Sequence, residues 1–261
     1  MKDDEAHRLG DELYSALRSR RCVAPITERS PGATIEDAYR ISKRMLDRRL
    51  SDGERVVGKK IGVTSDAVQR MLDVHQPDFG FLTDAMMFES GAEIRIDQLL
   101  IQPRAEGEIA FFLARDLSGP GVTEADVLSA TRSVAPCFEI VDSRIRDWKI
   151  RIEDTVADNA SSGVFVLGRE RVDPRSMDLR ACHIEVSKNG APLSEGIGAA
   201  ALASPLYCVA WLANTLSRFG IPLLAGEVVL SGSLVPLEPV RAGDRMDLVL
   251  SGIGSASVAF V

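Results

Sequence analysis

Hydrophobic residues recur at helical spacing through the first part of the chain. In DDEAHRLGDELYSALRS a leucine stands at every fourth residue, which is typical of the buried face of a helix. Thr34 and Asp37 have the spacing of a capping box, so a second helix is expected to run through TIEDAYRISKRMLDRRL. Ser65 is expected to cap a third, short helix. Its apolar residues would be Val68, Met71 and Leu72.

From about Gly80 the pattern changes to alternation, which predicts strands. The segment EIRIDQLLIQPRAEGEIAFFLARDL alternates on both sides of a break at Pro103, and PCFEIVDSRI is typical of a further strand. ACHIEVSKNGAPLSEG predicts a hairpin whose Asn189-Gly190 turn suits type I′. The tail EVVLSGSLVPLEPVRAGDRMDLVLSGIGSASVAFV predicts three more short strands.

Two later helices are expected between these strands. Thr123 and Asp126 have the spacing of another helix start, leading into DVLSATRSV. Ser204-Pro205 opens an apolar segment that ends at Gly220, as expected of a helix with a serine cap.

Together these elements predict an α+β fold that acts as one functional unit. Residues 1–78 would form a helical N-terminal region, and residues 79–261 a mostly antiparallel β domain. With 261 residues, of which 45% are hydrophobic, the chain is long enough for one large globular core.

Charge and cysteine usage narrow the class of function. The net charge is −7 and no Lys/Arg cluster is present, so neither nucleic acid nor an anionic membrane surface is an expected partner. The four cysteines are widely spaced, which disfavours both a disulfide framework and a zinc site. The N-terminus is charged from its second residue, so a cytoplasmic location is expected. An anionic substrate would then need local positive charge, which a bound metal ion could supply.

Glu106 and Glu108 form the first candidate for such a metal site. They are one residue apart in EGEIAFFLARDL, so on a strand both side chains point to the same face, roughly 7 Å apart. The other face carries Ile109, Phe111 and Leu113, which is a core pattern. Like charges repel unless water or a cation lies between them. For this pair alone, a solvated outer face is the simpler interpretation.

Glu139 is the second candidate, because it lies inside the apolar segment PCFEIVDSRI. A carboxylate buried in such a strand needs a partner. Three carboxylates with water suit Mg²⁺ or Mn²⁺, which prefer hard oxygen ligands. Spacing along the chain does not by itself bring Glu139 to Glu106 and Glu108, so this site is a hypothesis.

Four blocks of the sequence resemble the hydratase/decarboxylase family of the fumarylacetoacetate hydrolase superfamily. They are VGKKIGVTSDAVQRMLDVHQPDFGFL, IQPRAEGEIAFFL, CFEIVDSRIRDWKI and DTVADNASSGVFVLG, and the resemblance covers nearly the whole chain. It implies the superfamily's β-roll of mixed and antiparallel strands, preceded by helices. It also implies a homo-oligomer, a pentamer or decamer, and a possible contact with a downstream aldolase.

The resemblance also assigns candidate roles to individual residues. It implies that the ligands of Mg²⁺ or Mn²⁺ are Glu106, Glu108 and Glu139. Lys60 would be an active-site lysine, Asp78 an acidic residue near the substrate, and Ser161 part of the substrate-binding region. Without the resemblance, Lys60 and Lys59 suit a pair of surface lysines, and Asp78 suits a turn after Pro77.

The activity implied is that of a hydro-lyase that adds water to 2-hydroxypenta-2,4-dienoate (2-oxopent-4-enoate) during breakdown of aromatic-ring cleavage products. Lys60 would carry protons if the metal and partial burial lower its pKa, and Asp78 would orient or deprotonate water. Alternatives are a 4-oxalocrotonate decarboxylase, a hydratase of a seven-carbon dicarboxylate, and a non-catalytic partner subunit.

Four basic residues could hold the second carboxylate of a diacid, although a solvated charged face explains them more simply. They are Arg144, Arg146, Lys149 and Arg151.

Overall fold

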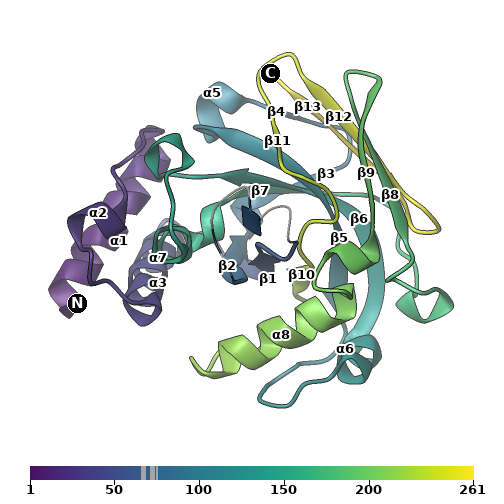
Figure 1. The fold of residues 1–261 in the computed structure, drawn as a ribbon, viewed down its shortest axis with the longest axis horizontal. Helices are drawn as coiled ribbons and strands as arrows, with labels where there is room; N and C mark the ends of the chain where they lie inside the picture. The colour runs from purple at the N-terminus through teal and green to yellow at the C-terminus, as the bar shows by residue number, and fades with distance from the viewer. Residues whose placement is uncertain (66–68, 71–73, 75) are drawn as a thin grey trace.

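The computed structural model describes residues 1–65, 69–70, 74 and 76–261 and arranges them around two curved β-sheets (Figure 1). Helices of the N-terminal part lie beside the sheets, and a later helix crosses below them in this view. Val68, Met71 and Leu72, the predicted apolar residues of the third helix, lie outside the described residues.

Up to residue 65, the N-terminal part contains the helices α1 (Asp3–Ser19), α2 (Ile26–Arg29) and α3 (Ile35–Ser51). Helices α1 and α3 pack against each other through their apolar faces. The residues buried there include Leu9, Leu13, Ile41 and Met45. The predicted capping box is confirmed, since the Thr34 N–H donates to Asp37 Oδ2 at 3.0 Å and the Asp37 N–H donates to Thr34 Oγ1 at 3.2 Å.

The larger sheet has eight strands and carries most of the candidate site. Its order is β2-β1-β10-β5-β6-β7-β3, and β11 pairs with β5 outside this path. The strands are β1 (Val56–Gly62), β2 (Asp78–Thr83), β3 (Met87–Glu89), β5 (Pro103–Leu113), β6 (Thr131–Asp142), β7 (Ser162–Leu167), β10 (Val228–Leu230) and β11 (Glu238–Pro239). The pairs β1–β10 and β3–β7 are parallel and the others antiparallel, so the sheet is mixed.

The second sheet has the order β4-β13-β12-β8-β9. Its strands are β4 (Ala92–Ile94), β8 (His183–Lys188), β9 (Ala191–Ile197), β12 (Arg245–Leu250) and β13 (Gly254–Phe260). The predicted hairpin is confirmed as β8–β9. Asn189 (φ 55°) and Gly190 (φ 80°) both have the left-handed backbone that a type I′ turn requires.

The second sheet packs against one face of β5, and the contact explains the glycine between the two glutamates. A Cβ at Gly107 would lie 2.6 Å from Ile184 Cδ1, so a side chain there would require the Ile184 side chain to move. Ile109 and Phe111, on the same face as Gly107, are completely buried in the main core. Glu106 and Glu108 therefore point away from the second sheet.

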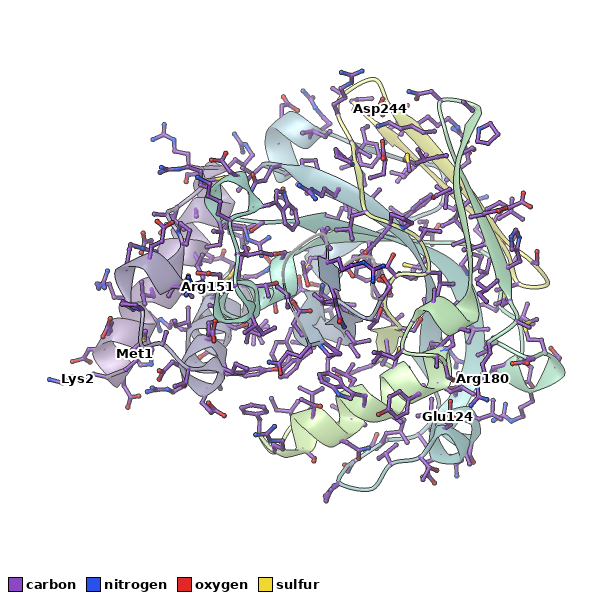
Figure 2. All side chains as sticks on the ribbon, viewed as in Figure 1. Met1, Lys2, Glu124, Arg151, Arg180 and Asp244 are labelled. Atoms are coloured by element: carbon purple, nitrogen blue, oxygen red, sulfur yellow. The ribbon has the colours of Figure 1, made fainter. Side chains whose placement is uncertain are left out.

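The remaining helices are α5 (Ile96–Leu99), α6 (Glu124–Ala130), α7 (Ile152–Ala157) and α8 (Pro205–Ser217). The serine cap predicted for α8 is confirmed, because Ser204 Oγ accepts the Tyr207 N–H. Helices α6 and α8 lie side by side, and Figure 2 shows Glu124 of α6 close to Arg180, with which it forms a 2.8 Å ion pair.

Gly198–Ser217 is apolar enough to qualify by composition as a membrane span, with a mean hydropathy of 1.3. Its helix α8 has 13 residues, and most of them are buried in the protein core. The four cysteines are free thiols, and three of them are buried.

The α+β class and the β-roll are confirmed, but some elements differ from the prediction. Strand β1 lies within the region expected to be helical, a short helix α5 interrupts the first alternating segment, and the tail forms four strands where three were expected. Strand β1 gave no alternating signal because its two lysines are buried along with its apolar residues. The sheets are mixed and mostly antiparallel, as expected, and the parallel pairs described are β1–β10, β3–β7 and β4–β13. The boundary at residue 78 stays a prediction.

Candidate active site

Three glutamates converge in the interior, on the face of the larger sheet that points away from the second sheet. Glu106, Glu108 and Glu139 are 5%, 0% and 1% exposed, and ligand oxygens from all three lie within 4.8 Å of one another. The interpretation of Glu106 and Glu108 as a solvated outer face is therefore wrong.

Strand register brings the glutamates together. Glu106 on β5 is directly opposite Glu139 on β6, and Glu108 is opposite Cys137. Residues two apart on a strand share a face, so all four side chains point to the same side of the β5–β6 pair.

The carboxylates are poorly compensated by hydrogen bonds. The Gly232 N–H donates to Glu108 Oε2 at 2.8 Å. Glu108 Oε1 and both carboxylate oxygens of Glu139 are buried and accept no hydrogen bond from the described residues. Burial, followed by the charge of Glu139, raises the pKa of Glu106 to about 8. Burial is also the main reason that the pKa values of Glu108 and Glu139 are raised.

These features suit a divalent cation with hard-oxygen preference. Three carboxylates beside one lysine leave a net charge of −2 when all are ionised, which Mg²⁺ or Mn²⁺ would balance. Around Mg²⁺, oxygens on opposite sides of the ion are about 4.2 Å apart. The observed 4.8 Å limit exceeds this by about 0.6 Å, and three of the oxygens accept no hydrogen bond in the described part of the chain. The residues present therefore fit the metal that the sequence predicts.

Lys60 is buried beside this cluster. It lies on β1, is 2% exposed, and its Nζ is 3.4 Å from Glu139 Oε1. Burial alone would lower the pKa of Lys60, but the charges of Glu139, Asp78 and Glu106 outweigh it and raise the pKa. The surface interpretation of Lys60 is therefore wrong. The lowering of its pKa by a bound metal ion stays a prediction.

Lys59, which the sequence suggested as a surface residue, is also buried. Its Nζ lies 2.5 and 2.6 Å from the two carboxylate oxygens of Glu227. Consecutive residues on a strand point to opposite faces, so Lys59 and Lys60 each need their own carboxylate partner.

Asp78 is the first residue of β2 and is opposite Gly62 on β1. It is buried in the sheet, so the turn interpretation is wrong. Asp78 Oδ2 accepts a 2.7 Å hydrogen bond from Thr155 Oγ1, whereas Oδ1 accepts none from any described residue. A Cβ at Gly62 would lie 2.4 Å from Asp78 Oδ1 and 2.9 Å from Lys60 Nζ. Gly62 therefore leaves space for both charged groups.

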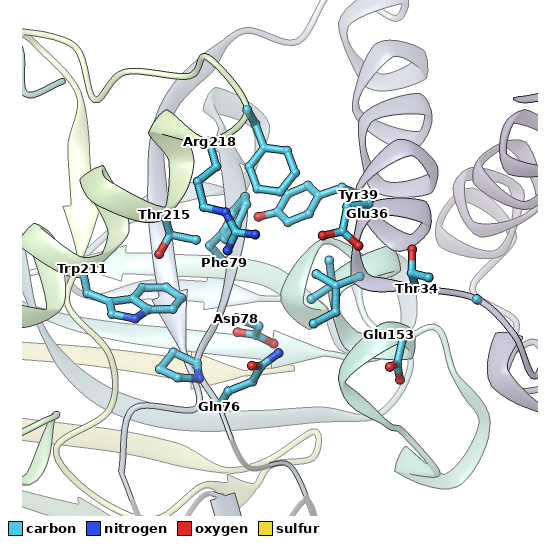
Figure 3. A pocket seen from close by; sticks show the side chains of 15 residues that line it. Thr34, Glu36, Tyr39, Gln76, Asp78, Phe79, Glu153, Trp211, Thr215 and Arg218 are labelled. Atoms are coloured by element: carbon cyan, nitrogen blue, oxygen red, sulfur yellow. The ribbon is translucent and has the colours of Figure 1, made fainter. Parts of the chain in front are cut away.

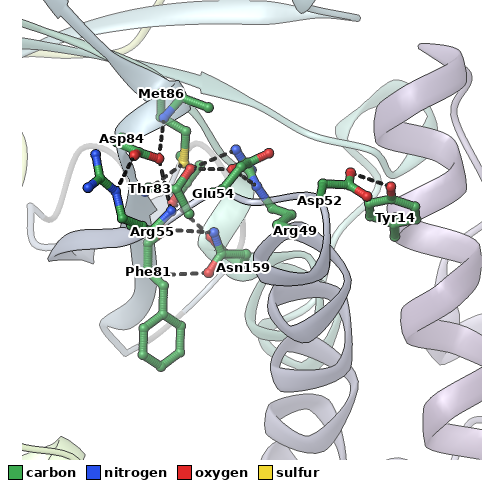
Figure 4. A network of polar contacts seen from close by, with 12 residues as sticks. Tyr14, Arg49, Asp52, Glu54, Arg55, Phe81, Thr83, Asp84, Met86 and Asn159 are labelled. Carbon is green, nitrogen blue, oxygen red and sulfur yellow. Dashed lines mark hydrogen bonds and ion pairs between the residues drawn. The ribbon is translucent and has the colours of Figure 1, made fainter.

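Ser161 reaches the site from a left-handed turn. Asn159, Ala160 and Ser161 have φ values of 53°, 51° and 52°, a costly conformation for residues other than glycine. The Asn159 side chain anchors this turn by exchanging two hydrogen bonds with the backbone of Phe81, at 2.8 and 2.9 Å (Figure 4). Ser161 Oγ is buried and makes no hydrogen bond to the described residues.

Arg144 does not serve as a substrate cation. It is completely buried, and its Nε donates to Asp158 Oδ1 at 2.6 Å while its other nitrogens donate to backbone carbonyls. Both interpretations of the basic segment thus fail for Arg144. The solvated interpretation holds for the exposed residues Arg146, Lys149 and Arg151.

The sequence analysis missed the loop that follows β10. Gly232 there donates to Glu108, and its φ of 91° suits glycine. A Cβ at Gly232 would lie 2.2 Å from Thr64 Oγ1, so Thr64 is adjacent to this loop. The hydroxyls of Thr64 and Ser231 are buried and have no hydrogen-bond partner among the residues described. The sequence does contain a signal for this loop, because Gly232 stands between two serines directly after the apolar strand β10.

Two hollows border Asp78. A cavity of about 20 Å³, roughly the space of one water, lies against Lys60, Asp78, Glu106 and Ser161. A larger groove of about 610 Å³ lies between α3, α7 and α8 (Figure 3). Tyr39, Trp211 and Arg218 contribute to its wall. The smaller cavity is the better candidate for the reaction, because it is lined by Glu106 and Lys60, whereas the groove is lined by neither.

The chain is similar to known proteins of one family. The family model of the fumarylacetoacetate (FAA) hydrolase C-terminal domain matches residues 57–261. A 2-hydroxyhexa-2,4-dienoate hydratase of Comamonas testosteroni is 62% identical over 252 residues, which cover 96% of each chain. A 2-hydroxypent-2,4-dienoate hydratase of Pseudomonas putida is 66% identical over 215 residues, covering 82% of this chain and 97% of the relative.

Among solved structures, 4-oxalocrotonate decarboxylase from Pseudomonas putida G7, complexed with magnesium and adipate, has a TM-score of 0.96 and 32% identity. The superposition covers 100% of this chain and 99% of that one. The family match over most of the chain and the identity to the two hydratases show that this protein belongs to the fumarylacetoacetate hydrolase family.

Proposed function

We propose that this protein is a metal-dependent hydro-lyase that converts 2-hydroxypenta-2,4-dienoate and water into 4-hydroxy-2-oxopentanoate. The observation that carries the proposal is the buried cluster of Glu106, Glu108 and Glu139, with Lys60 3.4 Å from Glu139. The hydratase names of relatives that are 62% and 66% identical support the same reaction.

The three glutamates are the proposed ligands of Mg²⁺ or Mn²⁺. When bound, such an ion would supply Lewis-acid chemistry that favours negative charge on the C2 oxygen of the substrate. The magnesium in the decarboxylase complex supports this choice of metal.

The chain's own residues handle protons and water. Hydration requires a proton at C5, hydroxide at C4 and a second proton at C3, while the C2 hydroxyl loses its proton. Lys60 Nζ is the proposed proton carrier, because it is the one cationic side chain among the described residues that line the small cavity. Asp78 Oδ1, which accepts no hydrogen bond from the described residues, would orient the water that attacks C4. Ser161 Oγ would donate a hydrogen bond to the substrate.

Decarboxylation of 4-oxalocrotonate is the second candidate reaction, favoured by the structural similarity to the decarboxylase. We rank it lower because that protein is 32% identical, about half the identity of the hydratases. A homo-oligomer, contact with an aldolase and a cytoplasmic location are further proposals that follow from the family.

The test is to follow the ultraviolet absorbance of 2-hydroxypenta-2,4-dienoate with purified protein and Mg²⁺ or Mn²⁺, and again after EDTA. We expect metal-dependent loss of the dienol with formation of 4-hydroxy-2-oxopentanoate. Absence of turnover by folded, metal-loaded protein would reject the hydratase. Release of CO₂ from 4-oxalocrotonate would then establish the decarboxylase instead.

A further inference from the structure

The small cavity combines two kinds of lining. Besides its polar residues, it has four apolar side chains, which we call the apolar wall. These are Val63, Val141, Trp148 and Leu237. Val63, Val141 and Leu237 are at most 7% exposed and form a buried cluster of their own, against which Trp148 packs. This cluster is separate from the clusters that hold the two sheets together.

Strand pairing fixes the apolar wall next to the glutamates. Val141 is two residues beyond Glu139 on β6 and therefore shares its face. Leu237 directly precedes Glu238, which pairs with Ala105, the neighbour of Glu106 on β5. A short molecule held at Glu106 would therefore have these apolar side chains beside it.

Three cations described in and beside the cavity already have partners. Lys60 faces Glu139, and Arg144 donates to Asp158 and to backbone carbonyls. The Arg104 guanidinium lies over the Trp148 ring, 4.7 Å from its centroid, and is not among the described lining residues. A second carboxylate on the substrate would thus lose its water against apolar side chains without gaining a cation from the residues that the structure describes.

Building on the proposed function, we propose that the apolar wall receives the uncharged C4–C5 end of a 2-hydroxydienoate and selects monocarboxylates over dicarboxylates. Leu237 and Val141 set the length of tail that fits. The free space of about 20 Å³ corresponds to roughly one water-sized group, so each added carbon of the tail must be accommodated by the wall.

The experiment compares kcat/KM of the Mg²⁺-loaded full-length enzyme for three substrates. They are 2-hydroxypenta-2,4-dienoate, 2-hydroxyhexa-2,4-dienoate and the six-carbon diacid 2-hydroxyhexa-2,4-dienedioate. We expect the diacid to be at least about 100-fold poorer, because its second carboxylate stays unpaired. Leu237→Ala should raise the ratio of hexadienoate to pentadienoate activity about tenfold, since one or two methylenes change such ratios by that order.

Leu237→Arg should shift the preference towards the diacid by supplying the missing cation. Leu193→Ala is the matched control, because Leu193 is a 38% exposed leucine on β9, and it should leave all three ratios unchanged. If Leu237→Arg does not fold, the assignment of the apolar wall is tested by the ratio of hexadienoate to pentadienoate activity in Leu237→Ala.

The outcomes separate this inference from the proposed function. If the wild-type enzyme hydrates the pentadienoate but uses the diacid equally well, or if Leu237→Ala leaves the chain-length ratio unchanged, the assignment of the apolar wall is overturned and the hydratase stands. If the metal-loaded enzyme converts none of the three substrates, the hydratase fails, and the assignment fails with it.

Discussion

Lys60 Nζ lies 3.4 Å from Glu139 Oε1, although their strands are separated in the sheet by β10 and β5. Strands three positions apart in a flat sheet are about 14 Å apart, and their side chains stand perpendicular to the sheet. The contact therefore depends on the curl of the larger sheet, which turns β1 towards β6. This curvature encloses the candidate site.

The position of Lys60 predicts that its substitution separates metal binding from turnover. Lys60→Met should lower kcat by about 10²- to 10⁴-fold, the range for a lost proton carrier. Mg²⁺ affinity, measured by calorimetry, should be retained or increased because a competing cation beside Glu139 is removed. Turnover that survives in Lys60→Met would remove this lysine from the mechanism.

Lys59 provides a contrast on the other face of β1. Lys59→Met should lower the free energy of unfolding by about 3–5 kcal/mol, because it leaves the buried Glu227 carboxylate without its cation. The double variant Lys59→Met/Glu227→Gln should recover much of this loss in urea titrations. Strictly additive losses would show that the pair is not coupled.

The raised pKa of Glu106 predicts how pH affects the metal-free protein. The folded state holds this proton from the ordinary value of 4.5 up to about 8, whereas the unfolded chain releases it near 4.5. The folded state therefore binds more protons in this interval, and stability should fall as pH rises through it.

Urea midpoints measured across this interval in EDTA should show that decline, and Glu106→Gln should flatten it. Saturating Mg²⁺ should also reduce it, because metal binding requires the ionised carboxylate. A midpoint in EDTA that rises with pH would contradict the burial of uncompensated carboxylates.

Gly62 predicts a steric effect on two functional groups at once. Gly62→Ala places a methyl group 2.4 Å from Asp78 Oδ1 and 2.9 Å from Lys60 Nζ, so one of these groups must move. We expect kcat/KM to fall at least about 100-fold, as for other misplaced catalytic groups. Gly32→Ala is the control, because a Cβ at Gly32 meets no atom within 4 Å. Equal activity of the two variants would contradict the positions of Lys60 and Asp78.

Substitution of Ser161 is expected to lower activity without lowering stability. Its buried hydroxyl makes no hydrogen bond to the described residues, so Ser161→Ala should leave thermal stability unchanged or slightly higher. If the hydroxyl binds substrate, kcat/KM should fall about tenfold, the value of one such hydrogen bond. A loss of stability without a loss of activity would assign Ser161 a structural role.

Local sequence pattern determined many elements of the fold. The Thr34–Asp37 capping box, the Asn189-Gly190 turn and the Ser204 cap were all predictable, because each depends on residues within a few positions along the chain. The shared face of Glu106 and Glu108 was predictable for the same reason. The expected roles of the metal ligands, Lys60, Asp78 and Ser161 came from the four blocks that resemble the family, because no local pattern contains them.

Only the tertiary structure decided which charged residues are buried and which of them meet. Glu139 meets Glu106 through the β5–β6 register, and Lys59 finds its partner 168 residues further along the chain. Burial of a charge depends on such distant partners, so Lys59, Lys60 and Arg144 gave no local signal of being buried. The sequence by itself determined the strands of the three glutamates and the shared face of Glu106 and Glu108, whereas long-range pairing and sheet curvature decided that Lys60 and Asp78 join them and how the site is enclosed.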